Sequence, residues 1–298
     1  MIPASIDATF GSTQIRTDYS DCVIVVRHRF SSDHKPFIKL SNKLQGRFVG
    51  AVVNNVDYTW TKPVIENGIE LALDILHNCE DSRPLCLIGH SMGGLVCRVA
   101  NIALTRTLEF QTYMTALSMA GGSNYLDPER RRAQGLRRRK VSGLVTLATP
   151  NSATLTYGQL AGWMKISTVA ARLGFPNKTA SFVDLTTDRL FRVLQSFSID
   201  TPTLSVSGSA HNRFAKKPPA LGVFVGLAGK LALPNDGLVE DRSVDLKVSI
   251  LPNEICHMGT GKYLHLREYS NCTDVTHSSI YDEIAVYEAL SAFIERTL

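Results

Sequence analysis

The chain has 298 residues, of which 44% are hydrophobic and 20% are charged, and its formal net charge at pH 7 is +5. This balance excludes a disordered chain, a collagen-like chain and a coiled coil, and it allows a globular core of ordinary size. No strongly apolar stretch reaches the roughly 18 residues of a membrane-spanning helix, and the first ten residues lack the basic and apolar regions of a standard secretory signal. Six cysteines without a C-x-x-C pair favour a reduced compartment, so we expect a cytoplasmic protein.

The positive charge is concentrated in one segment. Arg130 to Lys140 contains six Arg and one Lys and no acidic residue, so the rest of the chain is slightly acidic. We expect a solvated loop there, because seven cations do not form a core. Such a loop would permit peripheral contact with an anionic membrane. The chain has no zinc-finger spacing and no basic motif interleaved with aromatic residues, so its composition does not favour a nucleic-acid partner.

Apolar runs alternate with helical patterns along most of the chain. Short apolar or β-branched runs predict strands, and apolar residues three and four positions apart predict helices. The expected strands are 22–26, 48–53, 85–88, 144–147, 204–206 and 248–251, and the expected helices are 64–76, 94–104 and 281–298. This alternation predicts a mostly parallel central sheet flanked by helices, in a single α/β domain over residues 1–298.

Two stretches interrupt the alternation. Residues 152–198 have the pattern of two or three short helices, and residues 211–234 are apolar and rich in Gly and Pro. Insertions beyond the strand ends of an α/β sheet often cover the ligand site. We therefore expect a helical cap over 152–198 and a second apolar insertion over 211–234. The alternative is surface decoration, and their apolar residues could line an acyl pocket or form a core of their own.

The most informative segment is 85–96, which contains G-x-S-x-G with Ser91 at its centre, between a predicted strand and a predicted helix. A nucleophilic serine needs a sharp turn that presents its hydroxyl beyond the sheet, and Gly89 and Gly93 let the adjoining backbones approach closely. The N–H of Met92, at the start of the helix, is a candidate donor to an oxyanion. The alternative is a Gly-rich turn without chemistry.

Four segments in this order resemble the lipase and serine-esterase branch of the α/β-hydrolase superfamily. Pro84 to Arg98 resembles the nucleophile elbow of that branch, and Leu144 to Ser152 resembles its next strand and turn. Asn235 to Val239 resembles its acid loop, and Thr276 to Ser279 resembles its histidine loop. The nearest subgroup is similar to the lipase-like GPI-inositol deacylases. The resemblance implies an α/β-hydrolase fold and a serine hydrolase that cleaves carboxylic esters of lipid or other apolar acyl groups, without metal or cofactor.

The resemblance also implies the chain order serine, acid, histidine. His277, just before the final helix, is the expected base, and His257 is its rival. Asp236 is the expected acid that orients the base. Its rivals are Asp241, Asp245 and Asp57.

A second oxyanion donor is expected from the loop after the first strand. The family usually has His-Gly there, whereas this chain has His28-Arg29, so Arg29 leaves the geometry of this loop open. The N–H of Phe30 is the expected donor, and His28 is expected to hold the loop. His90, beside Ser91, is expected to pack beneath the turn rather than act as the base.

Two other functions stay open at this point. The same triad would serve a thioesterase, an amidase or an acyltransferase. A protein of this fold could instead be a ligand receptor with vestigial turnover, and Arg29 is the sequence feature that supports this reading.

Overall fold

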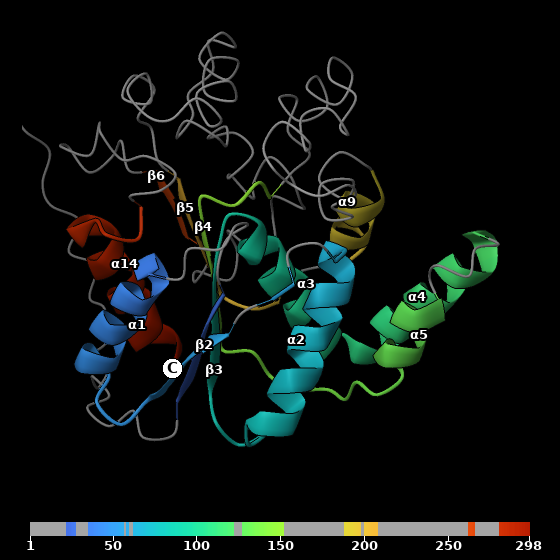
Figure 1. Ribbon diagram of the computed structural model, residues 1–298, viewed down its shortest axis with the longest axis horizontal. Helices are drawn as coiled ribbons and strands as arrows, with labels where there is room; N and C mark the ends of the chain where they lie inside the picture. Colours follow the sequence, from blue (N-terminus) through green and yellow to red (C-terminus); the bar gives the residue numbers. More distant parts are fainter. Residues whose placement is uncertain are drawn as a thin grey trace, which may run out of the picture.

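The computed structural model describes residues 22–27, 35–56, 58–59, 62–121, 127–151, 188–197, 200–207, 262–265 and 280–298. Within these ranges six strands form one sheet in the spatial order β2-β1-β3-β4-β5-β6 (Figure 1). The strands are β1 (Val23–Arg27), β2 (Val52–Val56), β3 (Leu85–His90), β4 (Gly143–Leu147), β5 (Thr203–Ser207) and β6 (Lys262–His265). Every neighbouring pair is parallel, which confirms the predicted sheet.

Helices cover both faces of this sheet. Those of the described ranges are α1 (Lys35–Arg47), α2 (Val64–Asn78), α3 (Met92–Thr105), α4 (Thr107–Gly121), α5 (Asp127–Ala133), α9 (Asp188–Gln195) and α14 (Ile284–Thr297). α1 and α14 lie on one face, and α2 and α3 lie on the other (Figure 1). α4 and α5 extend outward on the side of α2 and α3.

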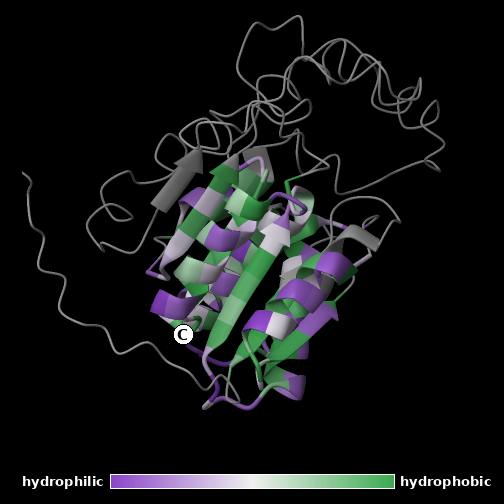
Figure 2. Cartoon of the chain, turned by 90° about the vertical axis from the view of Figure 1, so that its left-hand side faces the viewer, coloured by the Kyte–Doolittle hydropathy of each residue, from purple (hydrophilic) through white to green (hydrophobic). Residues whose placement is uncertain are grey.

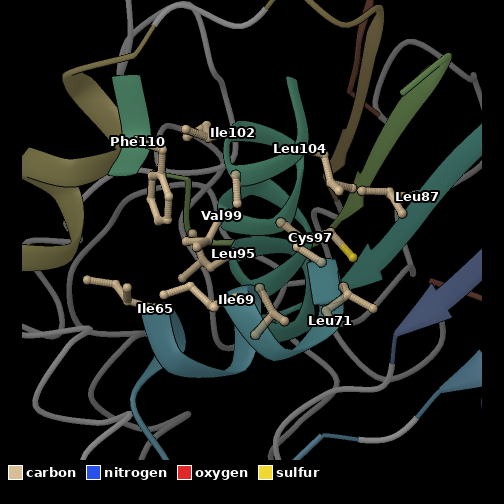
Figure 3. Close-up of a cluster of buried hydrophobic side chains, with 14 of the residues drawn as sticks. Ile65, Ile69, Leu71, Leu87, Leu95, Cys97, Val99, Ile102, Leu104 and Phe110 are labelled. Carbon is tan, nitrogen blue, oxygen red and sulfur yellow. The ribbon is translucent and has the colours of Figure 1, made fainter. Parts of the chain in front are cut away.

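The central strand β3 connects the two halves of the core, because successive side chains of a strand point to opposite faces. Leu85 and Leu87 join the buried cluster of α2 and α3 (Figure 3). Cys86 and Ile88 join the cluster of α1 and α14. All six residues of β3 are buried, as expected for a strand covered on both sides. In Figure 2 the strands are mainly hydrophobic, whereas the helices also carry hydrophilic residues.

The packing of α2 on α3 fixes the helix that begins after Ser91. A Cβ atom placed on Gly68 of α2 would lie only 2.4 Å from Cβ of Val99 on α3. The absence of a side chain at Gly68 therefore allows the two helices to come into close contact. Val99 is itself completely buried in this contact.

The second strand differs from the prediction. We expected it at 48–53, but β2 is Val52–Val56. Phe48 is instead fully buried at the end of α1, where its N–H donates to the carbonyl of Leu44 at 2.8 Å. Asn54 and Asn55, which follow the expected strand, lie within β2. Polar residues are tolerated there because β2 is at the edge of the described sheet and its side chains are partly exposed.

The basic segment Arg130 to Lys140 is only in part the solvated loop that we expected, because residues 134–140 form a largely exposed connection but several of the cations are bound by the rest of the protein. Its first residues belong to α5, and Arg132 forms ion pairs with Glu66 and Glu70 of α2. Arg137 pairs with Asp81, in the turn before β3. The sequence did not predict these ion pairs because the acids are distant in sequence and only the fold brings them to the segment.

Arg139 differs most from the expected solvated loop, because this residue is only 3% exposed. Its Nη1 donates to the carbonyl of Cys79 at 2.7 Å, and its Nη2 donates to that of Arg83 at 3.2 Å. Burial lowers the pKa of Arg139 below its usual value. The side chain thus closes the turn between α2 and β3.

The predicted insertions fall almost entirely outside the described residues. Of 152–198 only 188–197 are described, and α9 is helical there. Residues 211–234 and the strand expected at 248–251 lie outside, whereas β6 was not predicted. Among the helices of the described ranges, none is long and apolar enough to cross a membrane.

Candidate active site

Ser91 occupies the turn between β3 and α3, at the carboxyl edge of the parallel sheet. Its φ of 55° and ψ of −131° lie in a region that residues other than Gly rarely adopt. The Ser91 N–H donates to the carbonyl of Leu147, the last residue of β4, at 2.8 Å. The turn therefore has the strained geometry that the motif predicted, and a neighbouring strand holds it.

Glycines allow the close approaches within this turn. A Cβ atom on Gly89 would lie 2.5 Å from the carbonyl oxygen of Gly93 and 2.6 Å from backbone atoms of Gly94. A Cβ atom on Gly94 would lie 2.0 Å from Oγ1 of Thr149. Gly89 thus has the predicted function. The close approach at Gly94 was not predicted, because its partner follows β4 and is far away in sequence.

The first turn of α3 presents backbone N–H groups next to Ser91. The first four N–H groups of a helix have no acceptor within the helix, and together they form the positive end of its dipole. Met92 is the first residue of α3, and the first turn contains no acidic residue. Negative charge that develops near Ser91 would therefore be stabilised there.

His90 is completely buried beneath the turn. Its ring packs edge-on against Tyr281, with 5.5 Å between the ring centres and an interplanar angle of 88°. This position confirms the packing role predicted for His90. The contact also joins the turn at Ser91 to the segment that precedes α14.

Two buried polar residues near the turn were missed from the sequence. Arg98 of α3 is completely buried and Asn151, after β4, is 1% exposed. Both lie within segments that were quoted only for their family resemblance. A cation inside the apolar pattern of a helix, and an amide directly after a buried strand, were the available signals.

The remaining predicted site residues lie outside the described part of the chain. These are Phe30, Asp236 and His277, together with the alternatives Asp57, Asp241, Asp245 and His257 and the loop residues His28 and Arg29. Their positions in the chain can still be related to the sheet. Phe30 follows β1, Asp236 lies between β5 and β6, and His277 lies between β6 and α14.

A hollow of about 500 Å³ lies beside α2, and Ser91 is not among the residues that line it. It is lined by Val56, Tyr58, Thr59, Asn67, Glu70, Leu73, Asp74, His77 and Arg132. Glu70 and Arg132 form an ion pair, so they contribute charges that neutralise each other. In the described ranges, no three His, Cys, Asp or Glu side chains are grouped so that they could hold a metal ion.

Solved structures share this architecture. The mature form of the Bacillus licheniformis lipase BlEst2 matches with a TM-score of 0.54 and 18% identity, over 94% of this chain and 92% of that chain. The metagenomic carboxyl esterase MGS0156 matches with a TM-score of 0.56 and 13% identity, over 95% of this chain and 78% of that chain. No protein-family model and no curated protein sequence matches. The chain therefore has the α/β-hydrolase fold.

Proposed function

We propose that the protein is a serine hydrolase that cleaves carboxylic esters. The observation that carries this proposal is the backbone of Ser91, which is strained and lies at the carboxyl edge of the sheet beside the first N–H groups of α3. Strained backbone of this kind costs on the order of 1–3 kcal/mol and is concentrated at functional sites. The two solved structures compared above are named as a lipase and a carboxyl esterase.

In the proposed mechanism, Ser91 attacks the ester carbonyl and forms an acyl-enzyme. His277 accepts the proton of the Ser91 hydroxyl and returns it to the leaving alcohol, and Asp236 orients His277. The N–H groups of Met92 and Phe30 stabilise the oxyanion. Water, activated by His277, then releases the acid.

Chain connectivity supports His277 as the base. Tyr281 comes four residues after His277, and four residues span at most about 14 Å. The ring of Tyr281 is 5.5 Å from that of His90, which immediately precedes Ser91. His277 is therefore tethered to the neighbourhood of Ser91, whereas His257 precedes β6 and has no such described anchor.

Strand topology supports Asp236 and Phe30. In a parallel sheet the carboxyl ends of all strands lie at one edge, and Ser91 follows the carboxyl end of β3. Phe30 comes three residues after the end of β1, and β1 is hydrogen-bonded to β3. Asp236 belongs to the connection that leaves the carboxyl end of β5.

The substrate class is the narrower part of the proposal. The apolar composition of residues 211–234 favours an acyl chain over a small polar group, and the similarity to GPI-inositol-deacylase-like lipases points the same way. Peripheral contact with an anionic membrane would depend on the exposed cations Arg131, Arg138 and Lys140. A thioesterase, amidase or acyltransferase would use the same residues.

A panel of chromogenic substrates tests this function. We expect hydrolysis of nitrophenyl esters by the wild type, at rates that depend on acyl length, and background rates for Ser91→Ala. A matched thioester and anilide separate esterase activity from thioesterase and amidase activity. If a fluorophosphonate labels the protein but no substrate is hydrolysed, the result would contradict an enzymatic function. It would support the alternative that the protein is a ligand receptor with vestigial turnover.

A further inference from the structure

A buried arginine on α3 binds the segment that follows β4. Nη1 of Arg98 donates to the backbone carbonyl of Asn151 at 2.7 Å and to its Oδ1 at 3.3 Å. Arg98 comes seven residues after Ser91, so two helical turns place it on the side of α3 that continues from Ser91. The pair is named the Arg98–Asn151 clamp below.

Asn151 extends the clamp into the sheet. Its Nδ2 donates to Oγ1 of Thr146 on β4 at 3.3 Å and lies 3.5 Å from Oγ of Ser205 on β5. These two hydroxyl groups are themselves hydrogen-bonded at 2.8 Å. The backbone N–H of Asn151 donates to the carbonyl of Thr149 at 2.8 Å. The clamp therefore joins α3, β4 and β5 inside the protein.

The segment that the clamp holds contacts the Ser91 turn at two points. The carbonyl of Leu147 accepts the N–H of Ser91 at 2.8 Å, and Thr149 packs against Gly94. Between them, Ala148 has a φ of 47°, so this segment is also strained. Strained backbone persists only where surrounding contacts fix it. Two sets of contacts can do so: the Ala148 N–H donates to the carbonyl of Val206 on β5 at 2.8 Å, and Asn151 makes the buried side-chain contacts given above.

Stability alone does not explain a guanidinium in this position. Taking a charged group out of water is costly even where it is hydrogen-bonded, so a buried guanidinium is a poor source of stability by itself. We propose that Arg98 and Asn151 are positioning residues for Ser91, which fix the 147–151 segment and through it the strained turn. This inference rests on the proposed function, because it assumes that Ser91 is the nucleophile.

The test measures kcat and KM for a short nitrophenyl ester in Arg98→Met, Asn151→Ala and Asn151→Asp. We expect kcat to fall about 10- to 100-fold in the first two, because a displacement near 1 Å can cost that much. KM should change less than about threefold, since the clamp does not contact substrate. Asn151→Asp keeps an acceptor for Arg98, so its kcat should lie between that of Asn151→Ala and that of the wild type.

Thr201→Val is the matched control. Oγ1 of Thr201 donates to Oδ1 of Asn101 at 2.7 Å, which is another buried hydrogen bond between α3 and a strand connection, but at the other end of α3. This variant should be destabilised without loss of kcat. If Arg98→Met does not fold, the kcat of Asn151→Ala alone still tests the proposal.

Three results would overturn the positioning role of the clamp. The first is an unchanged kcat in folded Arg98→Met and Asn151→Ala, and the second is an equal loss of kcat in Thr201→Val. The third is a double variant, Arg98→Met with Asn151→Ala, in which the two effects on kcat are strictly additive. Failure of the proposed function gives a different result. In that case Ser91→Ala would retain wild-type turnover, or the wild type would have none.

Discussion

At the scale of single residues, Ser91 combines the proposed nucleophilic hydroxyl with an unfavourable backbone conformation. A side chain at φ 55° is strained, and glycine is the residue that accepts this conformation without cost. The neighbours of Ser91 maintain the conformation through the hydrogen bond to Leu147. Substitutions at this one position can therefore separate stability from activity.

Ser91→Gly and Ser91→Ala should both be inactive, with a loss of at least about 10³-fold in kcat. They should differ in stability, because Gly relieves the strained φ and Ala retains it. We expect Ser91→Gly to be more stable by about 1 kcal/mol, measured by denaturant unfolding. A more stable Ser91→Ala would show that the turn is not strained in solution.

His277→Ala should match Ser91→Ala in activity, because the base is needed for every turnover. His257→Ala should stay close to the wild type, since His257 precedes β6 and lacks the anchor at Tyr281. The two histidine variants are compared by their kcat/KM for one ester. An inactive His257→Ala together with an active His277→Ala would reverse the assignment.

Asp236→Asn should lower kcat about 10³- to 10⁴-fold, because an amide holds the histidine in the wrong tautomer. Asp241→Asn is the control and should have a mild effect. Both variants should fold normally, which circular dichroism checks. A severe loss in Asp241→Asn alone would move the acid to that position.

At the scale of elements, α3 carries the site and depends on close packing at its first turn. Gly94→Ala would place a Cβ atom 2.0 Å from Oγ1 of Thr149, so the 147–151 segment or α3 must shift. Such overpacking costs roughly 1–3 kcal/mol, and we expect that loss in the free energy of unfolding.

Gly46→Ala is the matched control for this substitution. Gly46 lies in α1, and a Cβ atom there would meet nothing within 4 Å. Ala is the better helix former, so this variant should gain up to about 1 kcal/mol. Equal effects of the two substitutions would show that the contact between Gly94 and Thr149 is not tight.

The sequence predicted those elements whose pattern is local. β1, β3 and β4 are mainly apolar runs, β5 contains the short β-forming sequence 204–206, and α2 and α3 have clear helical spacing. The turn at Ser91 was predictable because G-x-S-x-G specifies a backbone geometry. β2 was misplaced because an edge strand tolerates Asn54 and Asn55, which elsewhere indicate a break.

Long-range contacts explain what the sequence could not predict. Seven cations in eleven residues suggested a solvated loop, but Glu66, Glu70 and Asp81 pair with several of them across the fold. The clamp at Asn151 likewise depends on residues of three separate elements. The assignments of Phe30, Asp236 and His277 remain predictions, because those residues lie outside the described ranges.

At the scale of the whole molecule, the last part of the basic segment, Arg137 to Lys140, and Ser91 lie toward opposite ends of strand β3. Ser142, just after the segment, donates its N–H to the carbonyl of Leu85, the first residue of β3, at 2.7 Å. Ser91 follows the last residue of that strand, about 20 Å away at 3.3 Å per residue. Contact of a membrane with Arg137 to Lys140 would therefore occur away from Ser91.

Binding to anionic vesicles should depend on Arg131, Arg138 and Lys140, which are exposed; Arg137 is also exposed, but it pairs with Asp81. Each contributes on the order of 1 kcal/mol at an anionic surface, and salt screens this attraction. The triple variant to Ser should lose vesicle binding at low salt and retain hydrolysis of a soluble ester. Co-sedimentation measures this.

Arg132→Ser is the control for the vesicle experiment. Arg132 pairs with Glu66 and Glu70, so its removal should affect stability more than vesicle binding. Equal sedimentation of the wild type and the triple variant would exclude the exposed cations as a membrane contact.

The central claim is that Ser91 is the nucleophile of a serine hydrolase. The most direct measurement is mass spectrometry of the protein after reaction with a fluorophosphonate, followed by mapping of the modified peptide. We expect one adduct per chain, located on Ser91 and absent from Ser91→Ala, with loss of ester hydrolysis in proportion to labelling. An adduct on another residue, or full hydrolysis by a protein completely modified at Ser91, would contradict it.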